Sequence, residues 1–514
     1  MFAVPDHPWV DSADGAAVRI SMTCGERGLV QGRLVTVAAE IEESAVEADD
    51  LVALMTSWTG RILPDLSIGA DVAGAVALRA NERLCSVGMK TIGDAFQIDG
   101  STARKLGLGE APGAEKIIRR YLNGRDLASA PRGVYVIDLF GVSETDVRGN
   151  FPAVYQHLLT RAKPERDHNR NRIFRDFWWV IGHPRPQFRA STIGLRRYVA
   201  TIETSKHRFL TFLPTDIVPD STLVTFALDD AYFLGVLSSG VHVAWALAAG
   251  GRLGVGNDPR YNKTRCFETF PFPAPTDAQS ARIRDIVEQL DAHRKRQQAQ
   301  HPGFTLTGIY NVLEKLKAGE ALNAKEKAIH EQGLVSVLKQ LHDELDLAVL
   351  EAYGWSDLAP LMQVVNGNAA PATAGVATRE DARRALDDAL LTRLVALNAE
   401  RAAEEKRGLV RWLRPEFQAP GEKPAPQQVE IEVGGEEIVA AAAERKPWPK
   451  DLPDQVRGVA DVLTASRAPL SEHAIAAHFT GRGPWKRRLP QIVETLVSLG
   501  RARKVDGGRV LGAD

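Results

Sequence analysis

The chain has 514 residues, of which 44% are hydrophobic and 25% are charged, and its formal net charge is −1. This composition is typical of soluble globular proteins with roughly three or four domains. No run reaches the ~18 apolar residues that cross a bilayer, and the N-terminus lacks the features of a signal peptide. Cys24, Cys85 and Cys266 form no Cys-x-x-Cys pair, which argues against disulfides and zinc. We therefore expect a reduced, cytoplasmic protein with no metal site and no membrane partner.

The first sixty residues predict a small piece of sheet. Residues 16–23 and 29–37 are rich in β-branched and apolar side chains and flank a turn with Gly25 and Gly28, which is typical of a hairpin. A lone hairpin usually completes a sheet whose other strands come from elsewhere. Residues 38–60 carry a Glu/Ala/Leu pattern that we interpret as a helix or an ordered linker.

Residues 61–275 mix short strands, helices and turns. Strands are predicted at 133–140, 198–203 and 223–227, and helices at 151–162 and 231–238. Because these elements do not follow a regular βαβ order, the predicted fold class is α+β.

From residue 277 the pattern becomes helical. Apolar residues recur at helical spacing in the segments 281–300, 309–317, 324–353 and 379–407. Residues 366–378 are rich in Ala, Pro and Gly, and residues 418–427 are rich in Pro. Both segments are therefore predicted linkers.

The C-terminal residues predict a separate small module. Three short helices, 456–466, 471–479 and 485–499, precede a β-ribbon over 502–511. This order suits a winged helix, whose third helix would open near a phosphate backbone with Trp485-Lys-Arg-Arg488. A protein–protein docking domain fits these residues equally well.

Positive charge is concentrated between Arg161 and Leu210. This stretch holds ten arginines and two lysines against two aspartates and two glutamates, a local net charge of +8, with seven interleaved aromatic residues. Basic residues mixed with aromatics are typical of a nucleic-acid surface. The alternative is a solvated basic face beside an apolar core, with Trp178 and Trp179 buried. Composition alone does not separate the two interpretations.

A second candidate contact lies between residues 250 and 273. Glycines there precede Arg260, Lys263 and Arg265 and a run of aromatic residues and prolines. Glycine lacks the Cβ that would hold a phosphate away from the backbone, and the cations supply the charge. The segment therefore predicts a loop that contacts a polyanion.

These segments belong to a longer series of motifs in a fixed order. The series comprises Pro5-Asp-His-Pro-Trp9, Gly88-Met-Lys90, residues 121–126, Phe177-Trp-Trp179, residues 198–208, residues 250–273 and the helices from 277 to 355. It resembles the C-terminal part, with target recognition and helical regions, of single-chain Type IIG-like adenine-specific DNA methyltransferases. The resemblance covers roughly residues 5–415 and implies a β-rich target-recognition domain followed by a helical domain. The winged-helix-like module predicted from the C-terminal pattern would follow them.

The resemblance, together with the residue pattern beyond residue 415, predicts the domain boundaries. They are 1–37 for terminal strands of a methyltransferase core, 38–275 for the target-recognition domain, 276–365 for a helical clamp, 366–415 for a linker and helix, 416–451 for a Pro-rich linker and 452–514 for the winged-helix-like module.

The family's catalytic motifs are absent from the sequence. An adenine methyltransferase needs an Asn/Asp-Pro-Pro-Tyr/Phe loop around the flipped base and a Gly-rich turn for S-adenosylmethionine. The nearest segment, Asn257-Asp-Pro-Arg-Tyr261, has arginine in place of the second proline. No catalytic or cofactor-binding residue is therefore predicted. We expect the catalytic core either to lie on a separate chain, which would bind S-adenosylmethionine, or to have been lost. We therefore expect no standalone activity.

The predicted DNA-binding residues come from the two basic segments. They are Arg170, Arg172, Trp178, Trp179, Arg185, Arg189, Arg196, Arg197, Lys206, Arg208, Gly254, Gly256, Asn257, Arg260, Tyr261, Asn262, Lys263 and Arg265. Arginine forks suit guanine, and Asn262 or Gln187 suits adenine.

Three interpretations of function remain open at this point. The first is the recognition part of a SAM-dependent N6-adenine methyltransferase of a restriction–modification or phage-defence system. Its partners would be double-stranded DNA, a methyltransferase-core chain and further defence-system subunits. The second is a non-catalytic DNA-binding or assembly subunit of a defence complex. The third is an RNA-binding scaffold, because basic and aromatic surfaces do not distinguish the two nucleic acids.

Overall fold

The chain divides into two compact units, Met1–Pro426 and Gln427–Asp514. The computed structural model describes residues 2–8, 19–25, 31–42, 51–60, 62–63, 66, 68–253, 258–421, 446–449, 451–465, 472–480, 488–498, 502–505 and 509–512. Each unit has a hydrophobic core of its own.

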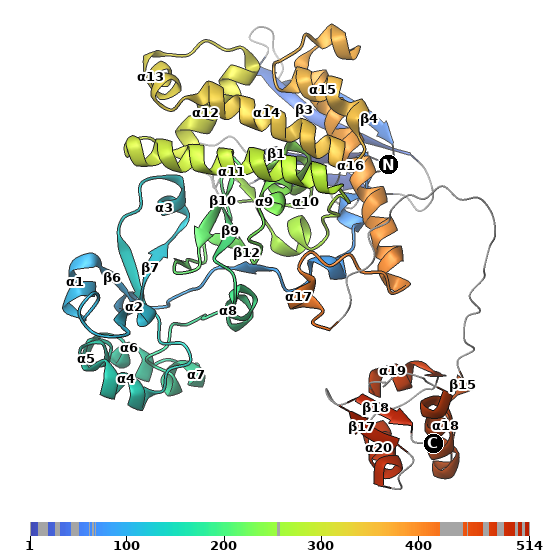
Figure 1. Ribbon diagram of the computed structural model, residues 1–514. Helices are drawn as coiled ribbons and strands as arrows, with labels where there is room; N and C mark the ends of the chain where they lie inside the picture. Colours follow the sequence, from blue (N-terminus) through green and yellow to red (C-terminus); the bar gives the residue numbers. More distant parts are fainter. Residues whose placement is uncertain are drawn as a thin grey trace. The chain divides into compact units, whose positions relative to one another are not determined.

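The chain begins with a four-stranded sheet in the order β2-β1-β3-β4 (Figure 1). Its strands are β1 (Phe2–Pro8), β2 (Arg19–Cys24), β3 (Gly32–Glu42) and β4 (Leu51–Gly60). The strands expected at 16–23 and 29–37 are present as β2 and β3. However, β2 pairs with β1 and not with β3, so the predicted hairpin is wrong.

The helix or linker expected over residues 38–60 is also wrong. Strand β3 continues to Glu42 and pairs with β4 antiparallel, from Gly32 opposite Gly60 to Glu42 opposite Leu51. The two long strands satisfy each other's backbone groups, and this pairing overrides the local helix propensity of the Glu and Ala residues. The predicted boundary at residue 37 therefore falls inside a strand.

Two further four-stranded sheets follow. The sheet β10-β9-β12-β5 contains β5 (Cys85–Val87), β9 (Arg197–Ile202), β10 (Leu210–Pro214) and β12 (Leu223–Phe226). The sheet β11-β7-β8-β6 contains β6 (Gln97–Asp99), β7 (Ile118–Leu122), β8 (Val134–Ile137) and β11 (Val218–Pro219). The strands predicted at 133–140, 198–203 and 223–227 are thereby confirmed as β8, β9 and β12.

Short helices lie beside these two sheets. They are α1 (Gly100–Lys105), α2 (Ala114–Ile117), α3 (Gly124–Ala128), α4 (Glu144–Asn150), α5 (Pro152–Arg161), α6 (Lys163–Asp167), α7 (Arg172–Asp176) and α8 (Pro186–Thr192). Helix α5 confirms the helix predicted over 151–162. We call residues 94–182 the small lobe; in Figure 1 it is the blue-green part that carries α1, α2 and α4 to α7.

Two apolar helices lie in the core of the first unit. Helix α9 (Ala231–Ser238) confirms the predicted helix over 231–238, and α10 (Gly240–Ala249) follows it. Among the described residues no single helix is long and apolar enough to cross a membrane. The α9–α10 pair passes that test jointly but bends by 62°, and Leu234 and Trp245 are fully buried. The pair therefore has the burial of core helices.

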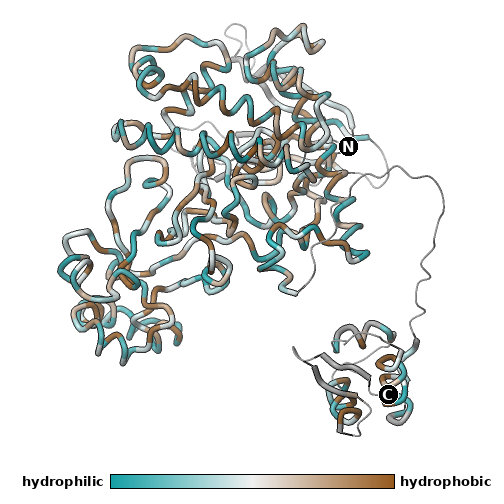
Figure 2. The backbone as a smooth tube through the Cα atoms, in the orientation of Figure 1, coloured by the Kyte–Doolittle hydropathy of each residue, from teal (hydrophilic) through white to brown (hydrophobic). Residues whose placement is uncertain are grey.

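The second half of this unit is largely helical. Its main helices are α11 (Asp277–Gln300), α12 (Leu306–Ala318), α13 (Ala324–Gln332), α14 (Val335–Ala352), α15 (Ala359–Val365) and α16 (Arg379–Lys406). Their apolar faces alternate with hydrophilic ones (Figure 2). Helix α11 buries Ile283, Val287 and Leu290 against α9 and α14, which is the face predicted from spacing.

The single long helix expected over 324–353 is wrong. The chain breaks between α13 and α14, where Leu334 has a left-handed backbone with φ 46°. A Cβ on Gly333 would lie 2.5 Å from the carbonyl oxygen of Ile329. Glycine therefore permits a turn that the apolar periodicity on either side did not reveal.

The end of the first unit is bonded to the segment before β5 and to the segment before α11. Asn398 on α16 donates to the carbonyl oxygens of Val76 (2.8 Å) and Thr269 (2.7 Å). Gln418 on α17 (Pro415–Gln418) donates to the carbonyl oxygens of Ala80 (2.9 Å) and Glu82 (2.8 Å). The helix within the segment predicted as a linker and helix, 366–415, is thus part of the compact unit.

The second unit contains three helices and a hairpin among its described residues. They are α18 (Leu452–Ala465), α19 (Glu472–Ala477), α20 (Leu489–Ser498), β17 (Ala502–Val505) and β18 (Arg509–Gly512), with β15 (Lys446–Pro447) and β16 (Phe479–Thr480) as a short parallel pair. This is the element order that we predicted for residues 452–514. The basic entry at 485–488 lies outside the described residues except for Arg488, so the winged-helix assignment stays a prediction.

Candidate nucleic-acid interface

The loop predicted to contact a polyanion returns along the end of β9. Strand β14 (Asp258–Arg260) pairs with β13 (Gly251–Leu253), and the Tyr261 amide donates to the Glu203 carbonyl oxygen at 2.7 Å. Asn262 then caps a short π-helix, η4 (Lys263–Phe267), by accepting from the Thr264 amide. We call residues 258–274 the exit loop. Gly254, Gly256 and Asn257 lie outside the described residues, so their predicted role remains untested.

The aromatic run of the exit loop belongs to the core. Phe267 and Phe270 are fully buried. The buried Asn81 amide donates to the carbonyl oxygens of both residues at 2.8 Å, and Asn398 donates to that of Thr269. Since these bonds satisfy carbonyls that burial removes from water, they hold the loop in one conformation.

Tyr261 is buried, with 1% of its surface exposed. Its hydroxyl lies 3.0 Å from Nε2 of His242, which is itself fully buried. Burial, with a smaller contribution from the charge of Arg208, lowers the pKa of His242 to about 3. Tyr261 is therefore a core residue and does not contact DNA in this conformation, and the near-match to a catalytic loop at 257–261 does not present an exposed aromatic ring.

The cations of the exit loop are mostly paired. Arg260 forms an ion pair with Glu203 at 2.8 Å, and Lys263 forms one with Glu268 at 2.7 Å. Arg265 is exposed and has no side-chain partner among the described residues. The loop thus carries less net positive charge than its sequence indicates.

Several arginines of the basic stretch also have structural partners. Arg189 binds both carboxylate oxygens of the buried Asp138, at 2.7 and 2.8 Å, and Arg119 approaches the same carboxylate at 3.3 Å. Arg197 forms a bidentate ion pair with Glu288 on α11. Such two-pronged pairs fix the arginine, so neither fork is free for guanine in this conformation.

Arg208 and the two tryptophans pack inward. Arg208 donates to the carbonyl oxygens of Ile202 and of Pro259 (3.1 Å), and burial lowers its pKa. Trp178 and Trp179 are 4% and 8% exposed, and the Trp179 indole donates to the Val142 carbonyl oxygen at 2.9 Å. Both tryptophans are therefore buried in the core, as the alternative interpretation of the basic stretch expected.

The remaining predicted residues are available at the surface to different degrees. Arg170 and Arg196 are exposed and have no side-chain partner in the described part of the chain. Arg172 pairs with Asp176 at 2.9 Å but remains 83% exposed, and exposed Lys206 donates to Asn311 at 2.8 Å. With Arg265, these side chains are the predicted contacts that a phosphate backbone can reach.

Sequence reasoning missed a cationic cluster where the small lobe joins the main sheets. Lys90 and His183 bond to each other's backbone, and Arg185 donates from Nε to the Gly88 carbonyl oxygen at 3.0 Å. A Cβ on Gly88 would lie 2.0 Å from the Asp220 carbonyl oxygen, so only glycine allows this approach. Burial, followed by the charges of Arg185 and Lys90, lowers the pKa of His183. We call Lys90, His183 and Arg185 the junction cluster. The sequence could not predict it, because its residues come from two distant segments that only the fold brings together.

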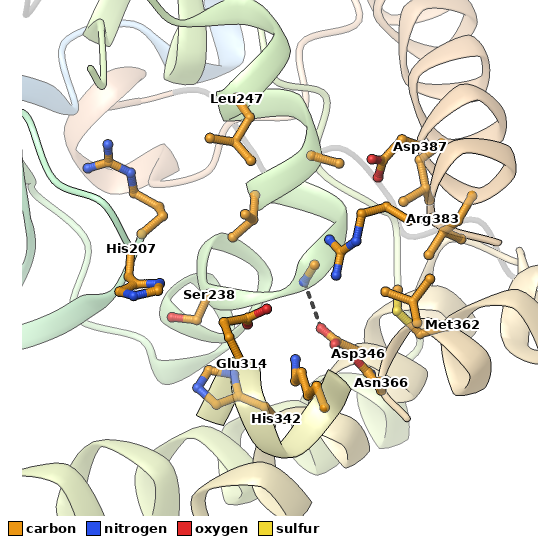
Figure 3. A pocket seen from close by; sticks show the side chains of 18 of the residues that line it. His207, Ser238, Leu247, Glu314, His342, Asp346, Met362, Asn366, Arg383 and Asp387 are labelled. Atoms are coloured by element: carbon orange, nitrogen blue, oxygen red, sulfur yellow. Dashed lines mark hydrogen bonds between the residues drawn. The ribbon is translucent and has the colours of Figure 1, made fainter. Parts of the chain in front are cut away.

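A pocket of about 420 Å³ separates the β9–β10 turn from helices α9, α10, α12, α14 and α16 (Figure 3). Asp346 accepts from the Gly240 amide at 2.6 Å, the dashed line in Figure 3, and from Asn366 at 3.1 Å. Burial raises the pKa of Asp346. The lining mixes cations such as Arg383 with carboxylates such as Asp387, so its charge does not match a polyanion.

The described residues offer no metal site, because no group of three or more His, Cys, Asp or Glu side chains comes together among them. S-adenosylmethionine would require open donors at a turn between a parallel strand and a helix. Strand β7, which is parallel to β11, leads into α3. There the Gly124 amide donates to Thr222 Oγ1 (2.8 Å) and the Asp126 amide to Asn123 (3.0 Å). These two amides are already occupied, so they do not present open donors to the cofactor.

Comparison with known proteins gives three matches. Residues 85–274 match the family model described as "MmeI, target recognition domain". DNA methyltransferase A of Bacillus subtilis (strain 168) is 32% identical over 114 residues, which are 21% of this chain and 12% of that protein. A solved structure of the Type IIL restriction-modification enzyme MmeI in complex with DNA shares the fold, with a TM-score of 0.52 and 18% identity, over 78% of this chain and 46% of that one.

The chain thus spans about half of the solved enzyme and about an eighth of the curated relative. The matched segment begins at β5 and ends just before α11, so it contains the basic stretch, the junction cluster and the exit loop. The resemblance found in the sequence is thereby confirmed: residues 85–274 match an MmeI-type target recognition domain, in a chain similar to restriction–modification DNA methyltransferases.

Proposed function

We propose that this chain supplies DNA sequence recognition for a SAM-dependent, site-specific N6-adenine DNA methyltransferase of a restriction–modification or phage-defence system. The observation that carries the proposal is the match of residues 85–274 to a target recognition domain. The solved relative with the same fold was determined with DNA, which supports duplex DNA as the partner. Cytoplasmic location is part of the same proposal.

Affinity would come from the cations that have no carboxylate partner. Arg170, Arg196 and Arg265 are exposed, and the junction cluster adds the charges of Lys90 and Arg185. Each phosphate contact releases a counterion, so the logarithm of the binding constant would fall with the logarithm of salt concentration by about 0.9 per contact. Exposed guanidinium and amide groups, chiefly those of Arg196 and Gln187, would read the base edges.

Paired arginines would act indirectly. Arg189 holds Asp138, which lies one residue beyond the end of β8, and Arg197 holds α11 against β9. These ion pairs would keep the recognition sheets in a fixed orientation, which is what base-edge readout requires. We therefore assign Arg189 and Arg197 positioning roles.

Methyl transfer would take place on a core outside these 514 residues. The sequence contains no Asn/Asp-Pro-Pro-Tyr/Phe loop, and the Gly124 and Asp126 amides of the β7–α3 turn already have partners. We propose that a separate chain binds S-adenosylmethionine and flips the adenine, while this chain selects the site.

The missing motif also favours a second candidate, a non-catalytic DNA-binding or assembly subunit of a defence complex. A methylation assay separates the two. The chain is incubated with duplex DNA and S-adenosylmethionine, alone and with a methyltransferase-core chain encoded beside it. Site-specific N6-methyladenine only in the mixture supports the recognition role. Binding without methylation in the mixture supports the second candidate, and methylation by this chain alone would contradict both.

A further inference from the structure

An open apolar groove of about 650 Å³ crosses the small lobe. Two segments form it, residues 140–144 after β8 and residues 173–184 from α7 to the start of α8. Trp179 forms part of the wall, and its indole is fixed by the bond to Val142. This hydrogen bond holds the Trp179 part of the wall in place.

Large apolar side chains stand exposed around this groove. Phe140 is 39% exposed, Phe177 is 54% exposed and Ile173 is 63% exposed. Phe177 lies against Trp179 with 5.7 Å between ring centroids. Contiguous exposed apolar surface of this kind marks an interaction site.

Uncompensated cations border the same groove. Pro184 and Gly182 line it, and they flank His183 of the junction cluster directly. Phe174, another lining residue, contacts the His183 ring edge to face at 6.4 Å. Lys90 is exposed, and neither it nor Arg185 has a carboxylate partner in the described part of the chain. The acidic residue of the lining is Glu144, which accepts from the Tyr155 hydroxyl at 3.0 Å.

We propose that this groove receives an unstacked nucleobase of bound DNA, with Phe177 as the stacking surface, while the junction cluster contacts the adjoining phosphates. The proposal rests on the proposed function and adds to it a place where the duplex is opened. An aromatic face next to a row of cations matches a nucleotide, which offers a π-face and a negative charge a few ångströms apart. An apolar protein segment would use the aromatic surface and leave the cations without partners.

Binding to two DNA probes tests the proposal with the full-length chain. The first probe is a short duplex with one unpaired 2-aminopurine, and the second is the same duplex fully paired. We expect tighter binding of the first probe, because no base pair must be broken. We also expect a rise in its fluorescence, because 2-aminopurine is quenched by its neighbours in the duplex stack and brightens when it leaves them for the groove. Phe177→Ala should weaken binding of the unpaired-base probe by about 5- to 140-fold, the range for one lost base stack, and should abolish the rise in fluorescence.

Two matched variants control for fold and charge. Ile193→Ala removes an apolar side chain that is 75% exposed and lies outside the groove lining, so we expect no change with either probe. Lys90→Ala should weaken both probes alike and lower the salt dependence by about 0.9, whereas Lys105→Ala on α1 should not.

Each remaining outcome counts against the groove. If Phe177→Ala binds both probes as the unaltered protein does, the base does not enter the groove and the inference fails while DNA recognition stands. If an apolar peptide from the core chain binds the unaltered protein without displacing either probe, and does not bind the Phe177→Ala variant, the groove binds protein and the inference fails. If the unaltered chain binds no duplex at low salt, the proposed function itself fails.

Discussion

The exit loop and the junction cluster both contain basic residues. Carboxylates neutralise most of the positive charge in the exit loop but not that of the junction cluster. In the exit loop, Arg260 and Lys263 are neutralised by Glu203 and Glu268. In the junction cluster, the charges that act on His183 are both positive. Because pairing decides where the field of a protein emerges, the density of arginines along a sequence does not locate the surface that attracts DNA.

The largest effect is expected at the buried carboxylate that two arginines share. Asp138→Ala should lower the free energy of unfolding by about 3–5 kcal/mol, since it leaves Arg119 and Arg189 half-buried without their carboxylate. Urea denaturation followed by circular dichroism measures the change. A stable Asp138→Ala protein with altered sequence preference would show instead that Arg189 reads bases.

A surface pair provides the matched control. Asp216 pairs with Arg120 at 3.0 Å, and both side chains are more than half exposed. Asp216→Ala should therefore change stability by less than ~1 kcal/mol. Equal losses for the two variants would remove the distinction between structural and surface arginines.

The buried His242, which bonds to Tyr261 of the exit loop, should make the stability of the protein depend on pH. The folded-state pKa of His242, about 3, lies below the ordinary value of 6.5. Unfolded chains therefore take up the proton first, and stability is full above pH 6.5 and falls as the pH drops toward 3. We expect a loss of about 1.4 kcal/mol per pH unit in this window from His242, measured by urea denaturation between pH 7 and about 5.

The variant His242→Gln isolates this contribution. Its stability at neutral pH should be lower, because a buried partner of Tyr261 is changed, but its dependence on pH should be weaker. Part of the dependence should persist, since burial also lowers the pKa of His342. An unchanged slope in His242→Gln would show that His242 does not titrate on unfolding.

The smallest effects are expected within the exit loop itself. Arg265→Ala should reduce the salt dependence of DNA binding by about 0.9 in the log–log slope, the value for one phosphate contact. Lys263→Ala should change it less, because Glu268 already holds the ammonium group at 2.7 Å. Filter binding over a salt series measures both. A larger effect for Lys263 would mean that its ion pair opens on DNA.

Local patterns predicted most individual elements. The apolar spacing of α11 and the β-branched run of β8 carry their own signal, because each buries a face whose period the sequence shows. The pairing of β3 with β4, and the break at Gly333, depend on partners and on backbone conformation instead. Neither is visible in the local composition.

The candidate site was predictable as a region but not residue by residue. The motifs located the recognition segment, and the match to residues 85–274 bears this out. They could not show that Tyr261 bonds to His242, that Arg189 bonds to Asp138, or that Arg185 bonds to Gly88. Each of these contacts joins segments separated along the chain, so burial and pairing appear only when the sheets are assembled.

Titration of a duplex with the purified full-length chain at increasing salt tests the central claim most directly. We predict binding at low salt, a linear loss of log affinity with log salt, and a shallower slope for Lys90→Ala and Arg265→Ala but not for Asp216→Ala. Absence of duplex binding at low salt, or a slope that none of these variants changes, would contradict the assignment of this chain to DNA recognition.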